Sequence, residues 1–154
     1  MTDTDPRSPS DARHSRALPF NVRVGTETRD VSSVEASIRR HGRTFLDRTF
    51  TAQEIHTCGG YDTEPHLLAA RLAGRFCAKE AALKMLRPTA IMPEWLDMEV
   101  VGVPGGWLRL NLTGIALQIA EERGIGDVQV SISQDGSVAV ATVIGVERSL
   151  DEAG

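Results

Sequence analysis

The chain has 154 residues, of which 41% are hydrophobic, 25% are charged and 5% are aromatic, and its formal net charge is -4. These values are typical of one globular domain with a mostly aliphatic core. The sequence contains no apolar run near the roughly 20 residues of a membrane helix, and residues 1–19 lack the apolar stretch of a signal peptide. We therefore expect a cytoplasmic protein with no membrane partner.

Basic residues concentrate in the middle of the chain. Between Arg39 and Arg87 there are nine Lys and Arg against five Asp and Glu, whereas the remainder has eight bases and sixteen acids. Such a region suits a phosphate-bearing ligand or an acidic partner. The pI of about 5.6 disfavours nucleic-acid binding. The chain has only two cysteines, Cys58 and Cys77, and they do not have the spacing of metal ligands. The four histidines do not have it either. We therefore expect no disulfide framework and no zinc site.

The N-terminal part of the chain predicts a leader, a strand and a helix. Residues 1–19 are rich in Ser, Pro, Asp and Arg without periodicity, which predicts a disordered leader. Alternating valines predict a short strand over 21–26. Apolar residues at helical spacing predict a helix over 30–41, with Asp30 as its N-cap and Gly42 at its end.

Two more helices are predicted before residue 88. Thr51 with Glu54 forms a capping-box pattern that opens a short helix. The longest helix is predicted over 65–86, because this stretch is dense in Ala and Leu and is followed by Arg87 and Pro88.

The C-terminal half predicts two hairpins around one helix. Segments 98–103 and 107–112 alternate about a Pro-Gly-Gly turn, and a helix is expected over 113–123. Segments 128–133 and 137–146 form the second hairpin, whose last strand is apolar on both faces and is therefore expected to be central. The whole pattern predicts one α+β domain over residues 20–148, with a mostly antiparallel sheet packed by a long central helix and shorter helices, and a tail over 149–154.

Charged residues interrupt the apolar stretch RFCAKEAALKML at the end of the long predicted helix. They fall on two neighbouring helical faces, with Phe76, Glu80 and Lys84 on one and Arg71, Arg75 and Lys79 on the other. Spacing alone favours an ordinary surface ion pair between Glu80 and Lys84.

Three segments, in this order and spacing, resemble holo-acyl-carrier-protein synthase, the small type of 4′-phosphopantetheinyl transferase. They read VGTETRDVSSVEASIRRHGRTFLDRTFTAQEI, LAGRFCAKEAALKML and VQVSISQDGSVAVATVI, and the resemblance covers residues 22–146. Its most specific part is the (F/W)xxKExxxK pattern that starts at Phe76, supported by an HGxxFLxRxFTxxE stretch over 41–54.

The resemblance implies a 4′-phosphopantetheinyl transferase-like fold and an enzyme that moves the phosphopantetheine arm of coenzyme A to a serine of an apo acyl carrier protein. Adenosine 3′,5′-bisphosphate is the other product. The implied cofactor is Mg²⁺, coenzyme A is the co-substrate, and the partners are an acyl carrier protein and two further copies of the chain in a homotrimer. Such enzymes serve fatty acid or polyketide biosynthesis.

The resemblance also implies roles for individual residues. Glu80 and Lys84 would be catalytic, and Glu27 and Glu80 would hold Mg²⁺. The residues that would bind coenzyme A are Arg75, Lys79, Lys84 and Gln134. Arg75 and Lys79 would either lie near the coenzyme A phosphates or order the site. Arginines that could meet an acidic carrier protein are Arg39, Arg40, Arg43 and Arg48.

Two positions of the implied metal and nucleotide site depart from the family pattern. Glu27 stands where the family has Asp, and Gln134 stands where it usually has His. Asp30 occupies the family's second acidic position, and we expect it to act as a helix cap. These departures motivate two alternatives. One is a catalytically impaired relative that binds carrier protein or coenzyme A as an interaction module, and the other is a repurposed site that acts on a carrier-tethered acyl chain.

Overall fold

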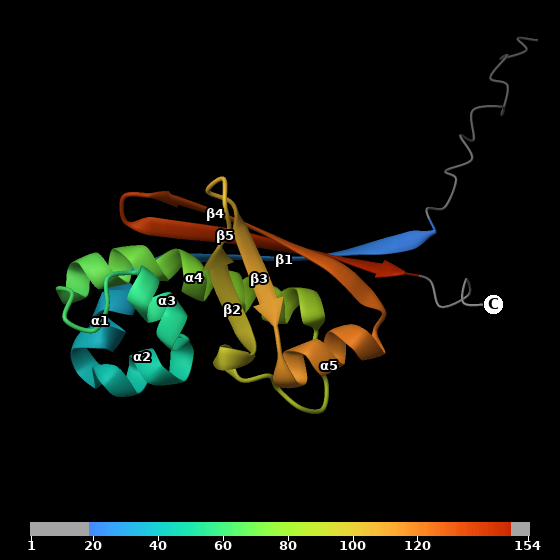
Figure 1. Cartoon of the computed structure of the whole chain (residues 1–154), viewed down its shortest axis with the longest axis horizontal. Coiled ribbons are helices and arrows are strands. Elements are labelled where there is room, and N and C mark those ends of the chain that lie inside the picture. Colours follow the sequence, from blue (N-terminus) through green and yellow to red (C-terminus); the bar gives the residue numbers. More distant parts are fainter. Residues whose placement is uncertain (1–18, 149–154) are drawn as a thin grey trace, which may run out of the picture.

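A computed structural model describes residues 19–148 of the chain (Figure 1). Apart from Pro19, the predicted leader lies outside the described residues, and so does the whole predicted tail. The elements, in chain order, are β1 (Phe20–Asp30), α1 (Val31–His41), α2 (Arg43–Thr49), α3 (Ala52–Thr57), α4 (Pro65–Leu86), a 3-10 helix η1 (Trp95–Asp97), β2 (Met98–Gly102), β3 (Leu108–Leu112), α5 (Gly114–Glu122), β4 (Ile125–Asp135) and β5 (Val138–Arg148).

The strands form two antiparallel sheets. One has the order β1-β5-β4, and the other is the β2-β3 hairpin. The last strand, β5, is central in its sheet, as its apolar sequence predicts. Helices α1, α2 and α3 gather at one end of the molecule, while α5 lies near the other end (Figure 1). The predicted α+β architecture is confirmed.

Helix α4 is the central element that the sequence predicts. Its start is fixed by Pro65 in the first turn and by the Glu64 side chain, which accepts a hydrogen bond from the Leu67 amide at 3.2 Å. It ends at Arg87, which adopts the left-handed conformation common at helix ends. Small alanines make up much of its buried surface, so neighbouring elements can approach the helix backbone closely.

Gly25 allows β1 to pack directly on α4. A Cβ atom at this position would lie 1.9 Å from the Ala81 carbonyl oxygen, so only glycine fits. Because alternate residues of a strand face the same side, Glu27 and Arg29 point toward α4 together with Gly25. This close contact therefore positions two charged side chains beside the motif-bearing half of α4.

Three local predictions need correction. β1 runs to Asp30 instead of ending near residue 26, because its whole length pairs with β5. Asp30 occupies the N-cap position of α1, but its side chain makes no capping bond. The Val31 amide instead donates to the Ser137 carbonyl at 2.7 Å. Helix α2 was not predicted, and Gly42, with φ of 52°, separates it from α1.

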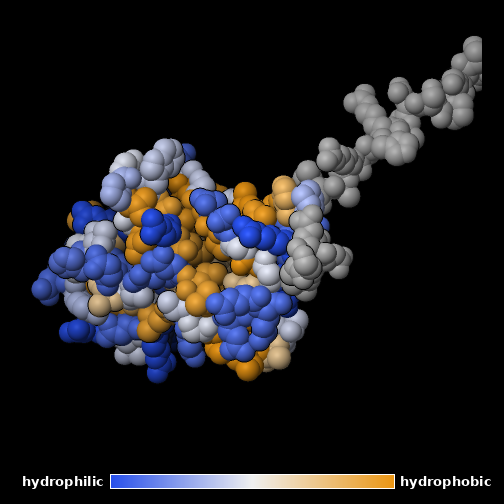
Figure 2. Space-filling view, turned by 45° about the vertical axis from the view of Figure 1, so that its right-hand side comes forward, coloured by the Kyte–Doolittle hydropathy of each residue, from blue (hydrophilic) through white to orange (hydrophobic). Residues whose placement is uncertain are grey.

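A cleft of about 810 Å³ separates the β2-β3 hairpin from β4. It is lined by β3, by the start of β4 and by residues of α5. Figure 2 shows hydrophobic surface in the middle of one face of the molecule, bordered by hydrophilic side chains. Within residues 19–148, no helix is long and apolar enough to cross a membrane.

Candidate functional site

The two charged faces of α4 serve two different neighbours. Glu80 and Lys84 face β1, whereas Lys79 faces α3. Glu80 and Lys84 thus lie on a different face of α4 from Lys79, as their spacing in the sequence indicates. However, the simple surface pair between Glu80 and Lys84 does not describe their partners, because each forms an ion pair with a residue of β1.

Four charged side chains form a cluster between β1 and α4, which we call the charged frame: Glu27, Arg29, Glu80 and Lys84. The Lys84 ammonium lies 3.0 Å from a Glu27 carboxylate oxygen and donates to the Thr26 carbonyl, also at 3.0 Å. Arg29 donates through Nε to Glu80 Oε2 at 2.9 Å, and through Nη2 to the other carboxylate oxygen. Each element therefore contributes one acid and one base.

The frame is electrostatically paired and partly open to solvent. The hydrogen bond from Lys84 holds the pKa of Glu27 below its usual range, and the Thr28 amide, 3.0 Å away, also lowers it. The hydrogen bond with Glu80 raises the pKa of Arg29. The Lys84 side chain is 54% exposed, against 17% for Glu80. Lys84 can therefore meet an anion from solvent while the Glu80 carboxylate stays in place.

Arg29 is the member of the frame that the sequence prediction missed. Its guanidinium also lies over the Phe76 ring, 4.7 Å from the ring centroid, so stacking fixes its orientation. The alternation of Gly25, Glu27 and Arg29 was the available signal. If the predicted strand had continued beyond residue 26, this alternation would have placed Arg29 on the same face as Glu27.

Lys79 and Arg75 lie away from the charged frame. Lys79 is fully buried and donates to Glu54 at 2.8 Å and to the Trp95 carbonyl at 3.0 Å. Burial lowers the pKa of Lys79, and the Glu54 carboxylate opposes this shift. Arg75 donates to the Arg71 carbonyl at 3.3 Å. Within one chain, Lys79 thus joins α4 to α3 and η1, and its role at the site stays a prediction.

Gln134 lies on the opposite edge of the three-stranded sheet from Glu27. It pairs with Ala139 of β5, which in turn pairs with Arg29 of β1. Two interstrand spacings, roughly 10 Å, therefore separate Gln134 from the frame within one chain. Its side chain is exposed, so its role in coenzyme A binding stays a prediction.

An aromatic cleft of about 680 Å³ opens near the charged frame. It lies between α2 and η1, and its lining includes Phe45, Phe76 and Trp95. The Phe76 ring packs edge to face on Trp95 at 5.4 Å and also carries the Arg29 guanidinium. Phe76 therefore connects this cleft to the frame.

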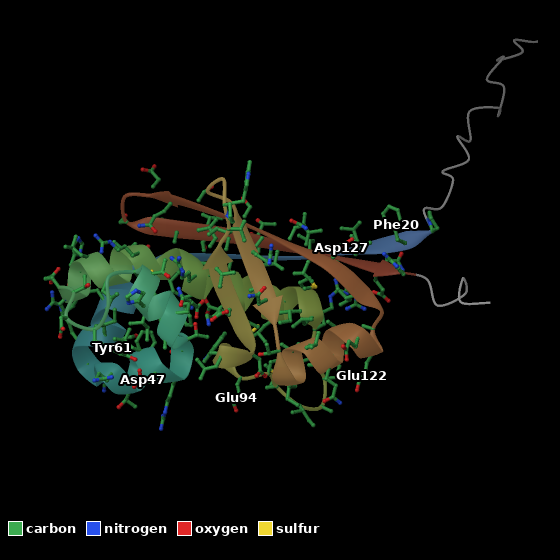
Figure 3. The ribbon with its side chains drawn as sticks, in the orientation of Figure 1. Phe20, Asp47, Tyr61, Glu94, Glu122 and Asp127 are labelled. Atoms are coloured by element: carbon green, nitrogen blue, oxygen red, sulfur yellow. The ribbon has the colours of Figure 1, made fainter. Side chains whose placement is uncertain are left out.

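Polar and basic groups lie around the aromatic cleft. The residues that line it include His41, Arg48 and Glu94. Figure 3 labels Glu94. Tyr61 donates a hydrogen bond to Asp47 at this end of the molecule, where the figure labels both residues. The lining of the cleft thus combines aromatic with charged side chains.

The sequence of residues 23–143 matches the model of the 4′-phosphopantetheinyl transferase superfamily. The chain belongs to this superfamily. Among curated members, the holo-[acyl-carrier-protein] synthase of Gloeobacter violaceus is 40% identical over 124 residues, which cover 80% of this chain and 92% of that protein. The holo-[acyl-carrier-protein] synthase of Moorella thermoacetica is 37% identical over 133 residues, covering 86% of this chain and 99% of that protein.

A solved structure of the superfamily also matches the fold. The ACPS-CoA complex of Chronobacterium ammoniagenes is 28% identical, with a TM-score of 0.66. The match covers 84% of this chain and 98% of that one. The fold expected from the sequence motifs is therefore confirmed.

The charged frame has the donor chemistry of a magnesium site, but its carboxylates are already paired. Glu27 and Glu80 come from facing elements, and Mg²⁺ at phosphate-transfer sites is commonly held by one or two carboxylates. Residues 19–148 contain no group of three or more His, Cys, Asp or Glu side chains placed to hold a metal. The residues present fit Mg²⁺ in kind, provided that Arg29 releases Glu80.

Proposed function

We propose that this protein is a holo-acyl-carrier-protein synthase, which transfers the 4′-phosphopantetheine arm of coenzyme A to a serine of an apo acyl carrier protein. The observation that carries the proposal is the convergence of Glu27, Glu80 and Lys84 between β1 and α4. The relatives named above, which carry that activity in their names, match this chain over at least 92% of their own lengths.

The chain's own residues can perform the central step. The serine oxygen forms a bond to the phosphorus that carries the pantetheine, and the bond from that phosphorus to the bridging oxygen breaks. Adenosine 3′,5′-bisphosphate then departs with the bond's electron pair. We assign Glu80 to accept the serine proton, and Lys84 to neutralise the diphosphate because its side chain is half exposed.

Magnesium dependence is part of the proposal. Glu27 and Glu80 would hold the ion, supported by their positions on facing elements. When bound, Mg²⁺ supplies positive charge that neutralises phosphate oxygens. The side chain of Glu27 is one methylene longer than that of the family's Asp. Glu27 can still hold the ion if this side chain folds back toward α4, where Lys84 already pairs with its carboxylate.

The acyl carrier protein would dock at the aromatic cleft. Carrier proteins of this kind are acidic, and His41 and Arg48 lie at the border of the cleft. Arg43 lies nearby, stacked on Tyr61 at 4.0 Å. Docking there would bring the carrier's serine close to Phe76, whose ring contacts the charged frame through Arg29.

The protein would assemble as a homotrimer. The open face of the three-stranded sheet exposes apolar side chains, among them Val22 at 56% and Val24 at 53%, which supports burial between copies. Sedimentation equilibrium should give a mass near three times the 16.7 kDa of the chain. A monomer mass at micromolar concentration would contradict the assembly.

We also propose a cytoplasmic location, supported by two free cysteines, Cys58 and Cys77.

A catalytically impaired or repurposed relative is the second candidate. The pairing of Glu80 with Arg29 favours it, because both oxygens of the carboxylate already accept hydrogen bonds from the guanidinium and are less available to a metal ion or to the serine hydroxyl. Gln134 adds to this reading, since an amide cannot carry the positive charge of histidine. Such a protein would still bind carrier protein or coenzyme A.

Mass spectrometry separates the two candidates. The full chain is incubated with coenzyme A, Mg²⁺ and a panel of apo carrier proteins, and the carriers are then examined for the added phosphopantetheine arm. We expect a complete mass shift on at least one carrier, and none when its acceptor serine is replaced by alanine. Unmodified carriers that still bind the protein would support the non-catalytic candidate instead.

A further inference from the structure

Arg29 uses both oxygens of the Glu80 carboxylate. Its Nε donates to Oε2 at 2.9 Å, and its Nη2 donates to Oε1. This two-pronged geometry is the strong form of an arginine–carboxylate pair. The Phe76 ring beneath the guanidinium also restricts its motion, at 4.7 Å from the ring centroid. Glu80 is therefore held by a well-oriented cation from β1.

The other proposed metal ligand has a looser partner. Glu27 pairs with Lys84, a single ammonium on a flexible stem with 54% of its side chain exposed. An ammonium can move into solvent at little cost, whereas a stacked two-pronged guanidinium has more interactions to lose. The two carboxylates of the charged frame are thus unequally available to an incoming metal ion.

We propose that Arg29 occupies the position on Glu80 that a divalent cation takes, so that the metal binds only by displacing Arg29. The inference deepens the proposed magnesium-dependent function and rests on it for its biological meaning. A guanidinium and a divalent cation within a few ångströms repel each other, and both require the same carboxylate oxygens. Arg29 is accordingly a residue that weakens metal affinity and raises the metal concentration needed for activity.

Release of Arg29 is physically accessible. Its side chain is 31% exposed, so the guanidinium can turn toward solvent, and the incoming metal ion would then neutralise the Glu80 carboxylate in its place. Arg23 offers a matched comparison on the same strand and face, where it forms an ion pair with Glu147. It lies six residues from Arg29, at the other end of the strand and outside the charged frame.

Direct metal titration tests the proposal. Mn²⁺, which shares the oxygen ligands of Mg²⁺, is added to the full chain without coenzyme A or carrier protein, and electron paramagnetic resonance measures the free ion. We expect Arg29→Met to bind Mn²⁺ about tenfold more tightly than the original chain, since one charge-assisted pair is removed. The control Arg23→Met should leave the affinity unchanged.

Two further variants locate the effect. Arg29→Lys, which keeps one charge but loses the two-pronged contact, should give an intermediate affinity. Adding Glu80→Gln to Arg29→Met should abolish the gain. Circular dichroism establishes that each variant is folded, and Arg29→Gln replaces Arg29→Met if the latter unfolds.

Three outcomes would overturn the inference: equal Mn²⁺ affinity with and without Arg29, undetectable binding in both proteins, or a gain that survives loss of Glu80. The titration contains neither substrate. A failure of the metal competition is therefore distinct from a failure of phosphopantetheine transfer, which the carrier assay measures separately.

Discussion

Replacing Glu80 by glutamine is expected to slow phosphopantetheine transfer by roughly 10²- to 10⁴-fold, the range typical for loss of a general base. Glutamine preserves the size of the side chain but cannot accept the serine proton. The fold should persist, because the Arg29 side chain that loses its ionic partner is 31% exposed. Single-turnover transfer at saturating coenzyme A and Mg²⁺, followed by mass spectrometry of the carrier, provides the measurement.

Two substitutions serve as comparisons for Glu80→Gln. Glu35 lies on α1, where it pairs with Arg39 and His66, and Glu35→Gln should leave the transfer rate unchanged. Glu27→Asp should preserve or raise the rate, because it restores the residue that the family has at this position. A Glu80→Gln variant as fast as the original chain would remove Glu80 from the chemistry.

Replacing Lys79 by methionine is expected to lower the free energy of unfolding by about 3–5 kcal/mol, the usual effect of breaking a buried ion pair. Lys79 and Glu54 are both fully buried, with their charged atoms 2.8 Å apart. Methionine fills a similar volume but leaves the Glu54 carboxylate without its cation. Urea unfolding followed by circular dichroism measures the change, with the slope checked for constancy.

A second substitution shows whether the buried charge is the cause. Glu54 also accepts hydrogen bonds from the Thr51 amide at 2.8 Å and from the Val100 amide at 2.9 Å. Adding Glu54→Gln to Lys79→Met removes the unpaired charge, so the double variant should recover part of the lost stability. Recovery should be incomplete, because the glutamine amide has one acceptor oxygen for these two backbone amides. The exposed pair of Arg39 with Glu35 gives the control, since Arg39→Met should cost far less.

The single variant Lys79→Met also separates two possible roles of Lys79. If Lys79 only orders the site, folded Lys79→Met should transfer phosphopantetheine with an unchanged KM for coenzyme A. If Lys79 contacts the coenzyme A phosphates in the working assembly, that KM should rise even where the protein is fully folded. If Lys79→Met lowers the free energy of unfolding no more than Arg39→Met does, the buried pair of Lys79 with Glu54 contributes little to stability.

The long helix and both hairpins could be predicted from the sequence because local signals specify them. Helix α4 is dense in Ala and Leu, begins with a proline and is followed by Arg87 and Pro88, and the hairpins alternate on either side of glycine turns. The end of β1 gave a weaker signal. Its last residues are polar, and they remain extended because they pair with β5, which lies more than 100 positions away.

The candidate site was predictable in part. The resemblance pointed to Glu27, Glu80 and Lys84, and the structure places all three between β1 and α4, while their catalytic roles stay predictions. Arg29 was missed because the strand was predicted to end near residue 26, so the alternation that places Arg29 on the face of Glu27 was not followed to that position. Glu54 shows a similar limit. Its capping box with Thr51 was predicted and is present, but its second role as the partner of Lys79 depends on how α3 packs against α4.

The pairing of β1 with β5 has a consequence for how the protein is made. These two strands pair over their whole length, from Phe20 with Arg148 to Asp30 with Val138, and β5 is the only partner of β1 among the described strands. On the ribosome, β1 must therefore wait until nearly all of residues 19–148 have been synthesised before it can pair with another strand. A chain cut before β5 would keep all four charges of the frame yet have no site.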